Sequence, residues 1–303
     1  MKPLECLFAA VAALAAPALH AAGFMPADIL KIQTVSDPSF SPDGRTLVYS
    51  VTVADTGKDE ETSDLWTVPL KGGTPTRITQ TAHSEWQPVF GPGGAVYFLS
   101  DAGESGGTQV WRMRIGGKPE VVTRFGQDIE DFALAPDGRK LAVIVRDPQI
   151  QPGAAKPVNP PPLVTTRFQF KEDITGYLDD RRLHLHLVDV NDGSSTALTR
   201  GPYDHYLPSF SPDSKHIAFV SKRGEDPDRH LNYDIYMVEA KAGGIEKQIT
   251  HYPGTDLDPY WETRPAWSPD GRKIAYVRSE GGQWTYYAPW QLAVVDLATG
   301  EES

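Results

Sequence analysis

A short turn motif recurs five times along this chain, each time between an apolar or aromatic residue and an alternating apolar run. The first copy is Ser41-Pro42-Asp43-Gly44, and the others span residues 91–94, 135–138, 211–214 and 268–271. Proline presets the backbone at the second position of a tight turn, and aspartate bonds back to the local backbone. Each copy therefore predicts a strand, a turn and a second strand, and their recurrence predicts a repeat protein.

The remainder of each repeat fits one blade of a β-propeller. A further apolar strand follows the turn after a similar interval in every copy but the third, and a glycine-bearing hairpin comes next. A short strand ends each of the first four units, so each holds four antiparallel strands in about 45 to 55 residues. We expect an all-β fold, a propeller of four complete four-stranded blades and a partial fifth, hence a truncated propeller.

The predicted propeller domain spans residues 23–303, with blades that start near residues 36, 86, 130, 206 and 262. One sheet cannot bury both of its faces alone, so neighbouring blades must stack around an axis. The fifth unit is expected to lack its outer strand, which leaves open blade edges at which the chain could oligomerise or aggregate.

The third unit carries an insertion over residues 146–182. Its first half, residues 146–162, holds six prolines, which exclude regular strand or helix and predict an extended loop. Insertions in a propeller lie at its rim, where they can cover the channel or touch another domain. The alternative is a solvated loop without function.

The first 22 residues predict a signal peptide rather than part of the fold. Lys2 gives a positive start, residues 7–19 form an alanine-rich apolar core, and cleavage is expected near Ala21 or Ala22. The chain is therefore expected to be periplasmic or secreted, and cleavage would remove Cys6, its only cysteine.

The net charge of −11 argues against nucleic-acid and anionic-membrane partners, because both need a basic surface. After the amino terminus no apolar run is long enough to cross a bilayer, so no membrane contact is expected once the signal peptide is cleaved. Neither a cofactor nor a metal is expected.

Three further stretches carry a resemblance to a known family. They are the entry at residues 27–38, the interrupted third blade with Arg167, residues 170–171, 176–177 and 181–185, and residues 203–205 before the fourth turn. With the repeated turn they resemble the amino-terminal propeller of the prolyl oligopeptidase family of serine peptidases, in its acylaminoacyl-peptidase and dipeptidyl-peptidase-like branch. The resemblance covers residues 24–303.

The resemblance implies a noncatalytic module that gates access of short peptides to an α/β-hydrolase domain with a Ser, Asp and His triad. That domain has no counterpart in this chain, so we expect the chain alone to be inactive and assign no catalytic residue. Gly103-Glu104-Ser105-Gly106-Gly107 fits the G-x-S-x-G pattern of a nucleophile elbow. An elbow needs a helix after it, whereas a further strand follows here, so we interpret this segment as a hairpin loop.

Arg167 and Tyr177 are the candidate residues for a substrate cavity, because a peptide's carboxylate and carbonyls need donors of their type. His184 and His186 share one strand face and could bind a metal, although a sheet-surface pair is favoured. Asp256, Asp258 and Glu262 could bind calcium or a peptide amine, although a solvated loop is favoured.

A second class of function stays open beside the peptidase module. The same turn repeat occurs in the Tol-system translocation propeller, so the chain could be a stand-alone periplasmic binding propeller that acts through protein partners. The short segment between the predicted signal peptide and the first blade argues against this alternative, because the Tol protein has an α/β domain there.

Overall fold

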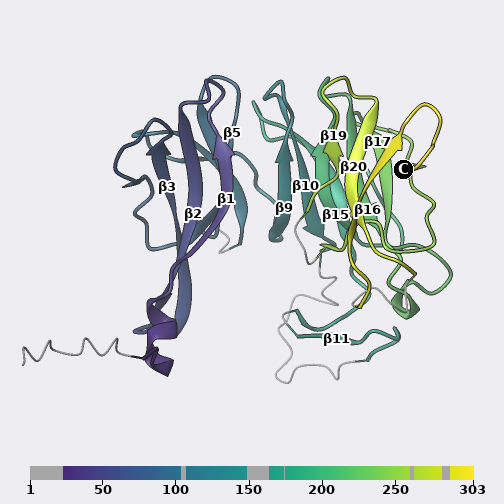
Figure 1. Cartoon of the computed structure of the whole chain (residues 1–303), viewed down its shortest axis with the longest axis horizontal. Coiled ribbons are helices and arrows are strands. Elements are labelled where there is room, and N and C mark those ends of the chain that lie inside the picture. The colour runs from purple at the N-terminus through teal and green to yellow at the C-terminus, as the bar shows by residue number, and fades with distance from the viewer. Residues whose placement is uncertain (1–22, 104–106, 149–163, 174, 260–262, 282–286) are drawn as a thin grey trace, which may run out of the picture.

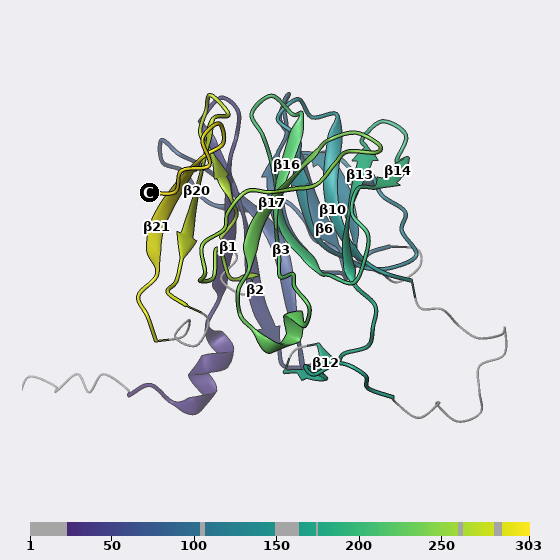
Figure 2. The ribbon, with the colours of Figure 1, turned by 90° about the vertical axis from the view of Figure 1, so that its right-hand side faces the viewer.

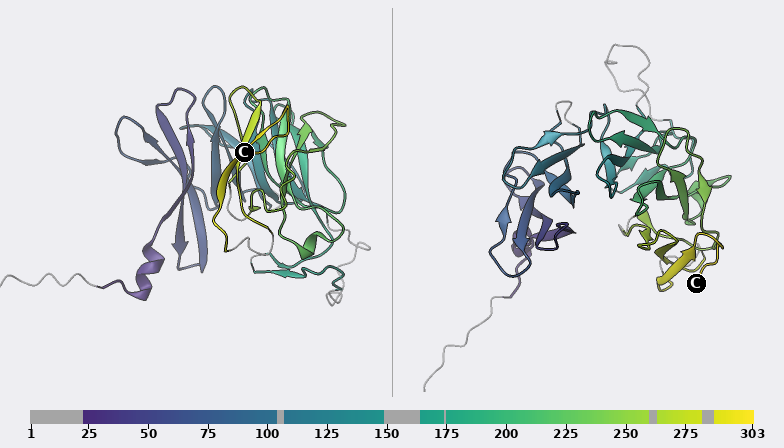
Figure 3. Two further views of the ribbon diagram at one scale, coloured as in Figure 1. Left: turned by 45° about the vertical axis from the view of Figure 1, so that its right-hand side comes forward. Right: turned by 90° about the horizontal axis from the view of Figure 1, so that it is seen from above.

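The computed structural model describes residues 23–103, 107–148, 164–173, 175–259, 263–281 and 287–303. In this part of the chain, four four-stranded antiparallel sheets, one three-stranded sheet and a small hairpin follow one another along the sequence. Seen from above, the five larger sheets stand as blades on an arc around a central space (Figure 3). The predicted all-β propeller architecture is therefore confirmed.

The first two blades each use four consecutive strands, from the inner strand at the axis to the outer strand. Blade one contains β1 (Thr34–Phe40), β2 (Thr46–Asp55), β3 (Glu60–Pro69) and β4 (Thr76–Arg77). Blade two contains β5 (Glu85–Phe90), β6 (Ala95–Ser100), β7 (Gln109–Arg114) and β8 (Glu120–Val121). A 3-10 helix, η1 (Pro26–Lys31), precedes blade one.

The other three blades follow the same order, with the insertion in blade three. Blade three contains β9 (Ile129–Leu134), β10 (Lys140–Arg146), β13 (Leu183–Asp189) and β14 (Ser195–Ala197). Blade four contains β15 (His205–Phe210), β16 (His216–Ser221), β17 (Asp234–Glu239) and β18 (Lys247–Gln248), with the 3-10 helix η2 (Pro227–Arg229) before β17. Blade five contains β19 (Ala266–Trp267), β20 (Lys273–Arg278) and β21 (Gln291–Asp296).

Residues 301–303 take the outer position beside β21 in blade five. Glu302 bridges Val295, and Val294 and Ser303 exchange two backbone hydrogen bonds of 2.9 Å. Blade five has three strands, as expected for a partial blade, and these last residues add only an isolated bridge at its outer edge. The short Thr-Gly turn at residues 299–300 returns the chain close enough to pair.

The three turn motifs that begin with serine are each closed by a hydrogen bond from the serine hydroxyl to the aspartate of the same turn. In the first copy, Ser41 Oγ donates to Asp43 Oδ1 at 2.7 Å, and Gly44 takes a positive φ of 63°. In the fourth copy Ser214 stands in the glycine position with a φ of 61°. Its hydroxyl accepts a hydrogen bond from the backbone N–H of Asp137 at 3.2 Å, so this turn also ties blade four to blade three.

The hydrophobic core consists of four clusters, one between each pair of neighbouring blades. The clusters lie between blades because the middle strands are apolar on both faces. In β10, Leu141 and Val143 pack toward blade two, while Ala142 and Ile144 pack toward blade four. The sequence of a strand that is buried on both faces is therefore a continuous apolar run and does not alternate between apolar and polar residues.

A threonine closes the outer edge of each of the first four blades in the same way. Its hydroxyl accepts a hydrogen bond of 2.8–2.9 Å from a backbone N–H of the third strand. The four pairs are Thr79 with Leu65, Thr123 with Val110, Thr199 with Leu185, and Thr250 with Ile235. These threonines are buried, and the outer strands end before them because the side chain replaces the backbone ladder.

The insertion forms a small hairpin under the blades. Strands β11 (Lys171–Glu172) and β12 (Gly176–Tyr177) pair below blades three and four, at the same end of the molecule as η1 (Figures 1 and 2). Residues 149–163, which hold most of the prolines, lie outside the described residues. Across the described ranges, no helix is long and apolar enough to span a membrane.

The threonine contacts generate a stability prediction. Thr199→Val keeps the shape of the side chain but leaves the buried N–H of Leu185 without an acceptor. An unsatisfied buried donor costs about 1–3 kcal/mol, so urea unfolding should show a loss of that size. Thr196→Val, at an exposed position in the same blade, is the matched control and should change little. Equal effects of the two variants would contradict the role of the hydroxyl.

Candidate functional site

Two cavities with some lining residues in common lie on the inner side of the blades. The larger, which we call the central cavity, measures about 1060 Å³ and is lined mainly by the inner strands of the blades. The smaller, which we call the side pocket, measures about 40 Å³ and lies between the insertion and blade four. Four residues line both cavities: Arg146, Glu172, Tyr206 and Tyr233. A molecule in the central cavity could therefore extend a small group into the side pocket.

The inner strands bulge where they face the central cavity. Asp37, Gln87 and Leu207 each precede a proline, take a φ of 52–53°, and coincide with a shift in strand register. Such left-handed backbone is strained for residues other than glycine and persists only where the surrounding structure holds it. The bulges place Asp37 and Gln87 in the cavity wall.

A belt of polar contacts crosses this wall from blade two to blade five. Gln87 Nε2 donates to Asp131 Oδ1 at 2.8 Å, and Arg264 forms an ion pair with the same carboxylate. Arg264 Nη1 also donates to the carbonyl of Pro208 at 2.9 Å. Two of the belt residues, Gln87 and Arg264, each precede a proline that lies shortly before a turn motif. This shared position in the repeat is the sequence signal that could have identified them.

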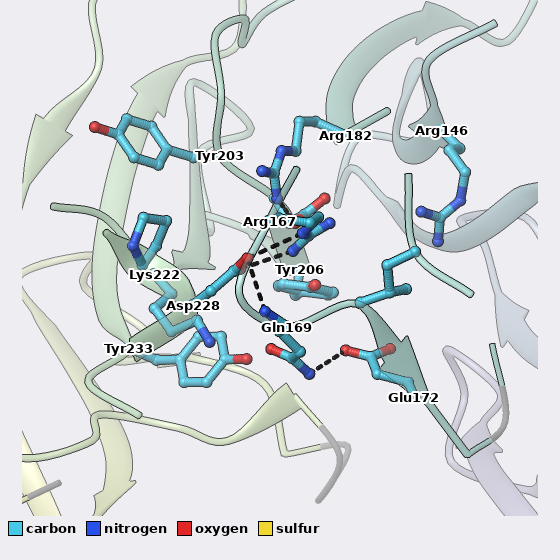
Figure 4. A pocket seen from close by; sticks show the side chains of 13 residues that line it. Arg146, Arg167, Gln169, Glu172, Arg182, Tyr203, Tyr206, Lys222, Asp228 and Tyr233 are labelled. Carbon is cyan, nitrogen blue, oxygen red and sulfur yellow. Dashed lines mark hydrogen bonds and ion pairs between the residues drawn. The ribbon is translucent and has the colours of Figure 1, made fainter. Parts of the chain in front are cut away.

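The insertion is fastened to blade four by a buried ion pair. We call the described part of residues 164–182 the strap. Arg167 donates to Asp228 through Nε at 3.1 Å and through Nη2 at 2.8 Å (Figure 4). The two side chains are only 11% and 6% exposed. Beside them, the guanidinium carbon of Arg229 lies 4.1 Å from the ring centre of Phe168.

The charges of this pair stabilise each other. Burial opposes ionisation of Asp228, but the hydrogen bond and charge of Arg167 outweigh it and lower the pKa of the carboxyl. The same hydrogen bond raises the pKa of Arg167 against its own desolvation. The pair is therefore charged at neutral pH.

The two predicted substrate residues are placed differently. Arg167 lies in the wall of the side pocket, where its guanidinium is already engaged by Asp228 and by the carbonyl of Asp179. Tyr177 lies on β12, is 63% exposed and lines neither cavity. The structure does not bring the two residues into one site, and their roles as substrate contacts stay predictions.

The side pocket also contains Lys222, which the sequence analysis did not single out. Lys222 lies beside Tyr233, with its amino group 5.2 Å from the ring centre (Figure 4). Tyr203, Tyr206 and Arg182 also line the pocket. Lys222 directly follows the predicted strand of the fourth repeat, but nothing in its local sequence separates it from an ordinary surface lysine.

His184 and His186 are not a pair on a solvent-facing sheet. His184 is buried with its ring 5.3 Å from that of His205, and His186 packs edge-on against Phe125. Burial lowers the pKa of both, to about 4 for His186. The favoured interpretation as a surface pair is wrong because both faces of this strand pack against neighbouring blades. Among the described residues, no group of His, Cys, Asp and Glu side chains is arranged to hold a metal ion.

The predicted solvated carboxylates of the connection before blade five are also buried. Asp256 is 0% exposed, and neither of its carboxylate oxygens accepts a hydrogen bond from the described residues. Asp258 is buried as well, whereas Glu262 lies outside the described residues. The solvated-loop interpretation is therefore wrong for the two aspartates. Burial raises the pKa of Asp256 to about 8 and that of the nearby Asp234 to about 7.

Asp256 makes the stability of the fold depend on pH. Its pKa rises from 3.8 in the unfolded chain to about 8 in the folded chain, so folding takes up a proton between these values. The stabilising effect of protonated Asp256 is complete below pH 4 and is lost as the pH rises to 8. Asp256→Asn should therefore raise the melting temperature increasingly from pH 5 to pH 8. The exposed Glu280→Gln is the control, and a pH-independent difference for Asp256→Asn would refute the assignment.

Removing Arg167 should release the strap. Arg167→Ala leaves the carboxylate of Asp228 buried without its partner, at a cost on the order of 3 kcal/mol. We expect faster amide hydrogen exchange in the strap and in the loop around η2, measured by mass spectrometry. Arg181→Ala is the matched control, because its ion pair with Asp179 is more exposed and should contribute about 0–1 kcal/mol. Unchanged exchange in the Arg167 variant would show that other contacts hold the strap.

The sequence of this chain is similar to those of two peptidases. Dipeptidyl-peptidase 5 of Porphyromonas gingivalis is 28% identical over 297 residues, which cover 92% of this chain and 42% of the relative. The uncharacterized peptidase YuxL of Bacillus subtilis is 27% identical over 222 residues, covering 70% and 33%. The chain therefore spans between a third and about two-fifths of the length of these relatives. No profile of a known protein family matches the chain.

Solved structures with the same fold include a peptidase and a TolB protein. The acylaminoacyl peptidase of Pyrococcus horikoshii matches with a TM-score of 0.65 and 15% identity, over 90% of this chain and 39% of that one. A putative TolB of Agrobacterium tumefaciens matches with a TM-score of 0.57 and 18% identity, over 89% and 80%. At these identities the structures show the propeller fold alone.

Proposed function

We propose that this chain, whose relatives and fold are those of the propeller in peptidases of the prolyl oligopeptidase family, is the module that admits short peptides to a hydrolase. The observation that carries the proposal is the central cavity at the blade axis, whose lining includes Glu172 and Thr175 of the strap. In this role the propeller binds unfolded peptide and keeps folded protein away from the catalytic centre.

The size and lining of the central cavity suit a short peptide. Sites for drug-sized ligands measure about 300–1000 Å³, so about 1060 Å³ accommodates a few residues of extended chain. A folded domain of 100 residues has a radius of gyration of about 13 Å and does not fit. Trp86 and Leu134 offer apolar contacts, while Gln87 and Asp37 offer hydrogen bonds.

The proposal includes export of the protein to the periplasm or beyond. The support is the charged and apolar pattern of residues 1–22, which lie outside the described structure. Recovery of the protein from the periplasm with an amino terminus at residue 22 or 23 would support export. Recovery of the full-length chain from the cytosol would contradict it.

A second candidate function is that of a stand-alone propeller that acts through protein partners. The observation behind it is the shared fold with the putative TolB structure. Peptide binding distinguishes the two, since a propeller of this type would hold a folded partner rather than a short unstructured peptide.

The purified chain should bind short unstructured peptides and should not hydrolyse them. Fluorescence anisotropy with labelled peptides of a few residues should give saturable binding, while a labelled folded domain should give none. The physical reason is that only an unfolded chain enters the central cavity. Binding of the folded domain without binding of peptides would favour the second candidate. Hydrolysis of acyl-amino acid anilides that Ser105→Ala abolishes would contradict the noncatalytic role.

A further inference from the structure

We propose that the side pocket binds the free carboxylate of a peptide lying in the central cavity, and that Lys222 is the cation that receives it. The inference rests on the proposed peptide-binding function and adds a substrate class to it, namely short peptides with a free carboxyl terminus.

All three acidic side chains of the side pocket already have partners. Asp228 is held by Arg167, and Asp204 accepts from Arg182 Nη1 at 3.0 Å. Glu172 accepts from Gln169 Nε2 at 2.9 Å and from the hydroxyl of Thr175. None of these carboxylates therefore has to be satisfied by Lys222.

The cations of the pocket are not equally engaged. Arg167 and Arg182 are bound to the two aspartates, and Arg146 lies 3.5 Å from Glu130. Lys222 forms no ion pair with the described residues, and its amino group makes a cation–π contact with the ring of Tyr233. Arg146 takes its partner Glu130 from outside the pocket, so Lys222 is the cation of this lining that has no ion-pair partner among the described residues.

The position of Lys222 makes a carboxylate ligand favourable. Burial lowers the pKa of its amino group, and Asp228 only partly offsets this effect. A desolvated cation without a close partner is costly, and an anion placed beside it restores the lost interaction. A hydrogen bond between an ammonium and a carboxylate is about twice as strong as one between neutral groups.

The dimensions of the pocket select a small anion at the end of a chain. One water molecule needs about 10–15 Å³, so about 40 Å³ holds a carboxylate group but no large side chain. Tyr206 and Tyr233 line both cavities, which gives a continuous wall from the pocket to the central cavity. A peptide in the central cavity could therefore place its last carboxylate beside Lys222 while its backbone stays at the axis.

The test compares three forms of one labelled peptide on the full chain: the free acid, the carboxyl-terminal amide, and an amide with an internal aspartate. For the natural protein, we expect the free acid to bind at least tenfold more tightly than the plain amide. Lys222→Met should abolish this difference without weakening the amide, and Lys222→Arg should retain it. Lys215→Met, which removes an exposed lysine of the same blade, is the matched control and should behave as the natural protein does.

The outcomes separate this inference from the proposed function. Equal binding of acid and amide to the natural protein overturns the carboxylate site and leaves peptide binding intact. An equally tight amide with an internal aspartate overturns the preference for a terminal carboxylate. Absence of binding for all three peptides overturns both proposals. Thermal melting of each variant shows whether the blade is still folded, and Lys222→Arg tests the charge should Lys222→Met unfold.

Discussion

The packing of each blade against the next is the constraint on which the rest of this structure depends. Each middle strand presents apolar residues on both faces, so no sheet can be buried without a neighbour on either side. The buried threonines fix the outer edges of the first four sheets, and the inter-blade clusters fix the distance from each sheet to the next. The cavities at the axis exist because this packing spaces the inner strands around a common centre.

The candidate site is assembled from segments far apart in the sequence. The strap comes from blade three, its anchor Asp228 from the loop before β17, and Lys222 from the end of β16. The inner strands supply the shared wall of the two cavities. The binding of a peptide at the axis would therefore depend more on the relative placement of blades three and four than on any single strand.

The sequence predicted the repeat well because the turn motif and the apolar runs follow local rules. It predicted an insertion at residues 146–182 but not that β11 and β12 pair within it, since two-residue strands leave no periodic signal. Arg167 was singled out, yet its partner Asp228 lies 61 residues away, and such a pairing depends on tertiary structure. The burial of Asp256 was missed for the same reason, because a carboxylate in a polar connection predicts solvent exposure.

The contact of Arg264 with Asp131 has a consequence for how the repeats communicate. Blade five reaches past blade four to a carboxylate of blade three, so this array is not coupled through nearest neighbours alone. In a strictly linear array, the loss of one end unit would be felt only by the adjoining unit. Here a perturbation of blade five passes directly to blade three through one side chain, which extends the cooperative unit over three blades.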